Sequence, residues 1–94
     1  MIKSCLIIES GSTQPRVFPF YQKLTIGRQS TNDIAIADRL VSKRHAAVGR
    51  VKGQIVVKDL GSRNGTFVNG EKVEKAILYS GDRLKIGLPA GASL

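Results

Sequence analysis

Short runs in which apolar and polar or small residues alternate recur along the chain. The clearest are Leu24–Ile26, Ile34–Ile36 and Leu84–Ile86, each with two apolar residues around one that differs. Side chains point alternately to the two faces of a β-strand, so a period of two predicts strands with one buried face. No window of helical length shows a period of 3.6 residues. The pattern therefore predicts an all-β fold.

Apolar segments without strict alternation predict further strands, at Leu6–Ile8, Val17–Tyr21, Ala47–Val51 and Ile55–Val57. Pro19 has no N–H to donate to a ladder, which favours an edge or bent strand at that position. Lys52-Gly53 and Asn69-Gly70 predict two-residue hairpin turns, because glycine adopts positive φ readily. Many short strands joined by glycine-rich turns are typical of a β-sandwich or β-barrel.

The length of 94 residues suits one domain, so we expect residues 1–94 to form it. Residues 88–94 contain proline and glycine and show no alternation. We therefore expect a tail or an incomplete last strand over that stretch.

The chain is strongly basic, with 15 Lys and Arg against seven Asp and Glu and a formal net charge of +8. This surplus favours an anionic partner, which could be nucleic acid, an acidic membrane face or a phosphorylated protein. The basic residues are spread from Lys3 to Lys85, as they are on an ordinary solvated surface. Nucleic-acid-binding barrels usually add aromatic platforms for base stacking. Aromatic residues are 5% of the chain and Trp is absent, so no nucleic-acid partner is expected.

Cys5 is the only cysteine, which excludes an intramolecular disulfide. Its place in the apolar run of residues 5–8 predicts a small buried side chain, and a lone thiol fits a reducing compartment. No run approaches the roughly 18 apolar residues of a membrane span, and the first residues lack the apolar stretch of a signal peptide. We expect a cytoplasmic protein that does not contact membranes.

The chain offers few groups for catalysis. His45 is the only histidine, so a Cys/His metal site with three or four ligands is excluded. Ser42 lies three positions before His45, but no orienting carboxylate is evident and no Gly-x-Ser-x-Gly elbow surrounds the serine. The glycines of residues 61–70 are not followed by the helix that a nucleotide-phosphate loop needs. We expect neither enzyme activity nor a cofactor.

Three junctions between strands and loops combine basic residues with hydroxyl or amide side chains, namely Gly27-Arg28, Ser42–His45 and Gly61–Thr66. A phosphomonoester carries a charge of about −1.5 to −2 and three strong acceptor oxygens. A guanidinium fork, a hydroxyl and backbone N–H groups hold such a group well. Each junction taken alone is better explained by ordinary turn chemistry. Together they favour a cationic pocket for phosphate.

These stretches, with others, resemble the motifs of the forkhead-associated (FHA) domain family. The matching segments are Gly27-Arg28, Asn32–Ile34, Val41–Ala46, Asp59–Gly70 and Gly81–Gly87, in the family's order and spacing. The resemblance implies an FHA-like β-sandwich of eleven strands in two twisted, largely antiparallel sheets, with recognition loops at one end. It places the motif core at residues 24–87. Family members usually add an apolar last strand, and residues 88–94 depart from that.

The resemblance also implies binding of a phosphothreonine peptide without catalysis. Arg28 matches the phosphate-binding arginine, and Ser42 matches the hydroxyl that joins it on the phosphate. Lys43 matches a position whose backbone N–H, and sometimes side chain, reaches the phosphate. Arg63 matches a loop position that contacts the phosphate or the peptide. Asn64 matches the asparagine whose side-chain amide holds the peptide backbone. The matching architectural positions are Gly27, His45, Asn69 and Gly70.

The sequence therefore predicts a phosphothreonine-peptide-binding module in Ser/Thr-kinase-dependent signalling, whose partner is a phosphothreonine-containing protein or peptide. Two alternatives stay open. One is a phospho-independent scaffold that docks or self-associates through a sheet face or an open edge. The other, less favoured, is a basic nucleic-acid-binding β-barrel. The sequence also leaves open whether the chain is part of a larger multidomain protein.

Overall fold

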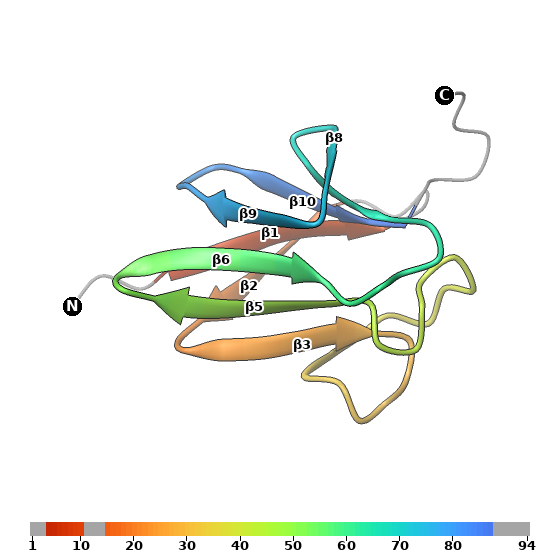
Figure 1. The fold of residues 1–94 in the computed structure, drawn as a ribbon. Coiled ribbons are helices and arrows are strands. Elements are labelled where there is room, and N and C mark those ends of the chain that lie inside the picture. Colours follow the sequence, from red (N-terminus) through yellow and green to blue (C-terminus); the bar gives the residue numbers. More distant parts are fainter. Residues whose placement is uncertain (1–3, 11–14, 88–94) are drawn as a thin grey trace.

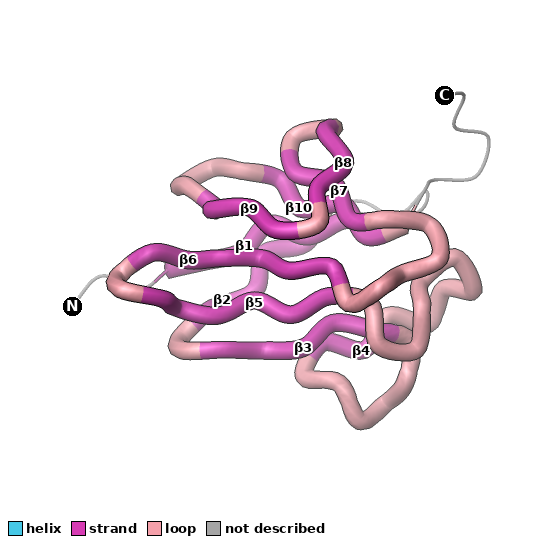
Figure 2. Tube along the Cα trace, in the orientation of Figure 1, coloured by secondary structure: helices cyan, strands magenta, loops and turns pink. Residues whose placement is uncertain are grey.

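The computed structural model describes residues 4–10 and 15–87, which form two five-stranded sheets packed face to face (Figures 1 and 2). The first sheet has the order β2-β1-β10-β7-β8, with bounds Arg16–Phe20, Ser4–Ser10, Arg83–Ile86, Thr66–Val68 and Glu71–Val73. The second has the order β4-β3-β5-β6-β9, with bounds Ile34–Ala35, Lys23–Gly27, Ala46–Val51, Gln54–Asp59 and Lys75–Leu78. The predicted all-β sandwich is confirmed.

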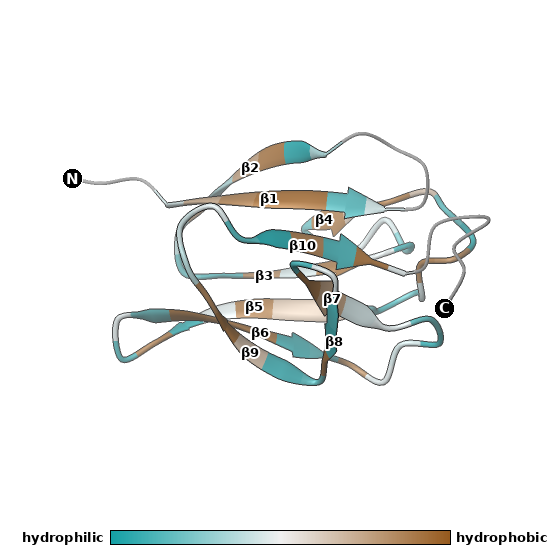
Figure 3. Ribbon diagram, turned by 90° about the horizontal axis from the view of Figure 1, so that it is seen from above, coloured by the Kyte–Doolittle hydropathy of each residue, from teal (hydrophilic) through white to brown (hydrophobic). Residues whose placement is uncertain are grey.

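Most strand pairs are antiparallel, and only β1–β10 and β3–β4 are parallel in the described part of the chain. Figure 3 shows the two layers edge-on, with β1, β2 and β10 in one and β5, β6 and β9 in the other. The described residues account for ten of the eleven strands that the resemblance implies. The doubtful last strand falls in residues 88–94, outside the described residues.

The core lies between the sheets and extends into the loops. Ile26, Val57 and Ile86 are completely buried on their strands, and Val41 is equally buried although it belongs to the loop between β4 and β5. Burial of such a side chain contributes about 1.5–3 kcal/mol. Val41 therefore anchors this loop to the core. The next residue in the loop is Ser42.

Both hairpin turns predicted from the sequence are confirmed by their backbone angles. Lys52 and Gly53 have φ of 51° and 80°, and Asn69 and Gly70 have φ of 51° and 87°. Positive φ at both central residues is the mark of a type I′ turn, whose twist matches that of the flanking strands. The Asn69 side chain adds a brace, because its Oδ1 accepts the backbone N–H of Arg83 at 2.9 Å.

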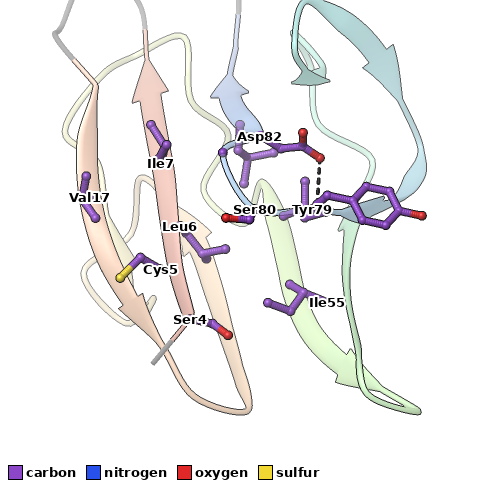
Figure 4. A pocket seen from close by; sticks show the side chains of 12 residues that line it. Ser4, Cys5, Leu6, Ile7, Val17, Ile55, Tyr79, Ser80 and Asp82 are labelled. Atoms are coloured by element: carbon purple, nitrogen blue, oxygen red, sulfur yellow. Dashed lines mark hydrogen bonds between the residues drawn. The ribbon is translucent and has the colours of Figure 1, made fainter. Parts of the chain in front are cut away.

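The first sheet confirms one prediction and corrects another. Pro19 lies on β2, at the edge of its sheet, as its missing N–H predicts. Cys5, predicted to be buried, is exposed instead. Leu6 and Ile8 take the inward positions of β1, so Cys5 between Ser4 and Leu6 must face outward (Figure 4). Among the described residues, no helix exists that could cross a membrane.

A cavity of about 550 Å³ opens between the sheets at the end where β1 and β6 begin and β9 ends (Figure 4). Leu6, Ile55 and Leu84 contribute apolar walls. Asp82 lies at its rim and accepts the backbone N–H of Tyr79 at 2.8 Å. This cavity shares no residue with the loops that carry the predicted phosphate-binding groups.

Candidate functional site

The strand order brings the three predicted loops to one end of the sandwich. Strand β3 runs towards that end, β5 begins there, and β6 returns to it, because the three are antiparallel neighbours. Residues 28–33, 36–45 and 60–65 therefore emerge side by side (Figure 1). Segments far apart in the sequence meet in one loop cluster.

Arg28 is joined to the second loop by two hydrogen bonds. Its backbone N–H donates to the carbonyl O of Ser42 at 2.9 Å, and its Nε–H donates to the carbonyl O of Val41 at 3.0 Å. The side chain is nevertheless exposed, and its terminal nitrogens have no partner among the described residues. The Nε bond fixes the direction of the guanidinium while leaving its other donors for a ligand.

Ser42 connects the second loop to the third. Its Oγ accepts the backbone N–H of Arg63 at 3.0 Å, and its own backbone N–H donates to Nδ1 of His45 at 3.0 Å. A hydroxyl carries one hydrogen and two lone pairs. With one lone pair occupied by Arg63, the hydroxyl hydrogen of Ser42 remains available to donate to an acceptor outside the protein.

His45 is completely buried and holds the second and third loops in register. Because Nδ1 accepts the Ser42 N–H, the ring proton must be on Nε2, which donates to the carbonyl O of Gly65 at 2.7 Å. Burial lowers the pKa of His45 below its ordinary value, although the bond to Gly65 and the charge of Asp59 oppose this shift. The neutral ring therefore braces the site.

Gly27 lies where two backbones approach too closely for a side chain. A Cβ at this position would overlap the carbonyl O of Lys43 and come within 2.6 Å of Nδ2 of Asn32. The buried Asn32 fills this contact by donating from Nδ2 to the carbonyls of Gln29 at 2.8 Å and Lys43 at 2.7 Å. Close approach explains the glycine, since its φ is not in the left-handed region.

The other predicted ligand-binding residues lie on the rim of the cluster. Lys43 and Arg63 have exposed side chains, and the backbone N–H of Lys43 has no partner among the described residues. Asn64 is half-buried and donates from Nδ2 to the carbonyl O of Leu40 at 2.8 Å. It keeps Oδ1 and its second N–H for a ligand. All five predicted binding residues thus belong to one loop cluster.

Asp59 shapes the third loop, a role that sequence reasoning did not assign. Its carboxylate accepts the backbone N–H groups of Gly61 at 3.0 Å and Ser62 at 2.9 Å, and the hydroxyl of Thr66 at 2.7 Å. Burial would raise the pKa of Asp59, but hydrogen bonds from the hydroxyls of Ser62 and Thr66 and from the backbone of Ser62, together with the nearby His45, lower it. The signal was present, because an aspartate two or three residues before Gly and Ser is typical of an Asx turn.

The basic side chains of the site are unpaired. In the described part of the chain, the ion pair between Lys85 and Glu9 at 3.6 Å is the one that forms, so Arg28, Lys43 and Arg63 form no ion pair there. Across the same residues, no three His, Cys, Asp or Glu side chains are grouped so that they could hold a metal ion. N–H and O–H donors among exposed cationic side chains suit an anionic ligand.

Comparison with known proteins identifies the family of the chain. The sequence profile of the FHA domain matches residues 24–87. The glycogen accumulation regulator GarA of Mycolicibacterium smegmatis is 40% identical over 83 residues, which are 87% of this chain and 52% of that protein. The chain thus spans about half the length of this curated relative.

Solved structures share the fold. One comes from a structural and functional analysis of phosphothreonine-dependent FHA domain interactions, with a TM-score of 0.72, 28% identity and coverage of 81% of this chain and 80% of that one. Another is Mycobacterium tuberculosis EmbR in complex with a low-affinity phosphopeptide, with a TM-score of 0.68, 27% identity and coverage of 82% and 23%.

Fold and loops together define a β-sandwich module that presents hydrogen-bond donors and cations from one end. The chain belongs to the FHA domain family.

Proposed function

We propose that this chain binds phosphothreonine-containing segments of partner proteins and acts as a non-catalytic interaction module in Ser/Thr-kinase signalling. The observation that carries the proposal is the joint placement of Arg28 and Ser42. Their backbones are hydrogen-bonded to each other, so the guanidinium and the hydroxyl emerge from adjacent points of one surface. A phosphate seated there would receive charge-assisted bonds from Arg28 and a hydroxyl bond from Ser42.

The energetics of such a contact are substantial. Each charge-assisted hydrogen bond contributes about 1.5–3 kcal/mol, which is roughly 10- to 100-fold in affinity. Lys43 would add its backbone N–H and its charge, and Arg63 a further cation. Asn64 would hold the peptide backbone, because its free Oδ1 can accept a backbone N–H and its second N–H can donate to a backbone carbonyl. Such contacts do not depend on the side chains of the peptide. A peptide, rather than free phosphate, is therefore the proposed ligand.

The relatives support the class of function. The name of GarA describes a regulator, and EmbR has been solved with a phosphopeptide. Because this chain covers about half of GarA, the identity of its own partner is not carried over. A cytoplasmic location, where Ser/Thr kinases would supply the phosphothreonine, is part of the proposal.

An oriented phosphothreonine peptide library, screened against the wild-type chain and Arg28→Ala, tests this function. We expect a selected set of peptides for the wild type and loss of about 10- to 100-fold in affinity for Arg28→Ala. Arg83→Ala is the matched control, because Arg83 is an exposed arginine on β10, away from the loop cluster. Failure of the wild type to select any phosphothreonine peptide, or equal loss in both variants, would refute the proposal.

A further inference from the structure

The outer face of the second sheet carries a shallow groove with a lysine rim. The strand register places Lys23, Gly49, Val56 and Ile77 in one row across β3, β5, β6 and β9. The next row consists of Thr25, Ala47, Lys58 and Lys75. This face is turned towards the reader in Figure 1, and no other described strand covers it. We refer to these eight residues as the lysine-rimmed face.

The hollow arises from small residues on β5. Ala47 and Gly49 occupy successive outward positions, while Val56 and Val51 stand beside them, and together they border a hollow of about 440 Å³. A Cβ placed on Gly49 would meet nothing within 4 Å, so the space above it is open. Val51 and Ile77 on the same face are 53% and 37% exposed, so large apolar side chains are left open to solvent there. The floor of the groove is therefore apolar.

The charges around the groove are unbalanced. Lys58 stands directly opposite Lys75 in the β6–β9 register, and like charges at such positions destabilise a sheet. Neither lysine, nor Lys23, forms an ion pair within the described ranges. Asp33 is the one carboxylate lining the groove, and it already accepts the backbone N–H and the hydroxyl of Thr25 at 2.8 and 3.3 Å. The groove is thus lined by three lysines against one carboxylate, and none of the three forms an ion pair in the described part of the chain.

We infer that the lysine-rimmed face is a second docking surface, for an acidic, unphosphorylated segment of a partner protein. An apolar side chain of that segment would enter the open space over Gly49, and its Asp or Glu side chains would pair with Lys58 and Lys75. None of the loop residues Arg28, Ser42 or Asn64 lines this groove. The surface is therefore independent of the proposed phosphothreonine site and could be occupied at the same time.

Selection of a random library of unphosphorylated dodecapeptides on the wild-type chain tests the inference. We expect selected peptides to combine Asp or Glu with Val, Leu or Ala. In a ¹⁵N NMR titration, such a peptide should shift the amides of Thr25, Ala47, Gly49 and Val56. Its affinity should fall as salt is added, because exposed charges are screened within about 8 Å at physiological ionic strength.

Two kinds of variant test the shape of the groove and the charge of its rim separately. Gly49→Leu places a large side chain in the groove, at a position where a Cβ meets nothing within 4 Å. Lys58→Glu reverses one rim charge. Each should weaken binding about 10-fold or more. Lys72→Glu makes the same change of charge on β8 of the other sheet and should bind like the wild type. Arg28→Ala should also bind normally, which distinguishes this surface from the phosphothreonine site.

Several results would overturn the inference. These are the absence of any selected peptide, selected peptides without acidic residues, or amide shifts confined to the loop cluster. Unchanged binding by a folded Gly49→Leu chain would also overturn it, with thermal unfolding as the check that the variant is folded. Sedimentation that shows a dimer abolished by Gly49→Leu would assign the groove to a second copy of this chain instead.

Discussion

The backbone N–H of Arg63 donates to Oγ of Ser42 at 3.0 Å, across 21 residues of sequence. This bond joins the loop after β4 to the loop after β6, and it occupies the hydroxyl as an acceptor. Ser42 therefore links the two loops, and its hydroxyl hydrogen is left to donate to a ligand. Substitutions at this position should affect ligand affinity and loop order together.

Ser42→Ala should weaken phosphothreonine-peptide binding by about 10-fold, because the phosphate loses the hydroxyl donor and Arg63 loses its acceptor. Ser42→Thr keeps the hydroxyl and should retain most of the affinity. Fluorescence anisotropy with a labelled phosphopeptide measures both. Equal affinities for wild type and Ser42→Ala would show that the hydroxyl does not contact the phosphate.

Arg28→Lys keeps the positive charge but removes the planar fork and the Nε–H that donates to Val41. We expect a loss of about 10-fold in phosphopeptide affinity, with thermal stability lowered by only a few degrees because the side chain is exposed. Calorimetric titration and a melting curve separate these effects. If Arg28→Lys bound as tightly as wild type, charge alone would explain the role of this residue.

Gly27→Ala and Gly49→Ala form a matched pair that tests close packing behind the loops. The new methyl at position 27 would overlap the Lys43 carbonyl, so we expect a cost of about 1–3 kcal/mol. The methyl at position 49 meets nothing, and replacing glycine in a strand should instead stabilise by about 0.5–1 kcal/mol. Urea unfolding measures both; similar changes in the free energy of unfolding would contradict the packing described for Gly27.

Stability should fall in mild acid because of His45. Burial holds the pKa of His45 below that of the unfolded chain, so the unfolded state binds more protons between the two values. The free energy of unfolding should therefore decrease as pH falls through about 6.5 and level off below the folded pKa. His45 is the only histidine, so His45→Gln should be less stable at neutral pH but lack this step. A step of the same size in His45→Gln would contradict this explanation.

Alternation and turn residues were enough to predict an all-β fold, the edge strand with Pro19 and both two-residue hairpin turns, while the sandwich followed from the resemblance to FHA domains. Strands β7, β8 and β9 were not identified, because they are three or four residues long and most of their side chains are not fully buried. Their pairing partners, rather than local pattern, make them strands. The exposure of Cys5 was missed for a related reason: a run of four apolar residues hides which two face inward.

The loop motifs brought the candidate residues to attention, and the structure shows how they are held. Sequence motifs could not show that His45 bonds to Ser42 and Gly65, or that Asn32 bridges Gln29 and Lys43, because these contacts depend on loops that meet only after the sheets pack. The binding roles of Arg28, Ser42, Lys43, Arg63 and Asn64 stay predictions.

The central claim is tested most directly by the dissociation constants of one library-selected peptide in three forms: phosphothreonine, phosphoserine and unmodified threonine. The account predicts measurable binding of the phosphothreonine form, with the unmodified form weaker by at least about 100-fold and the phosphoserine form also much weaker. Equal affinity for all three forms would contradict it.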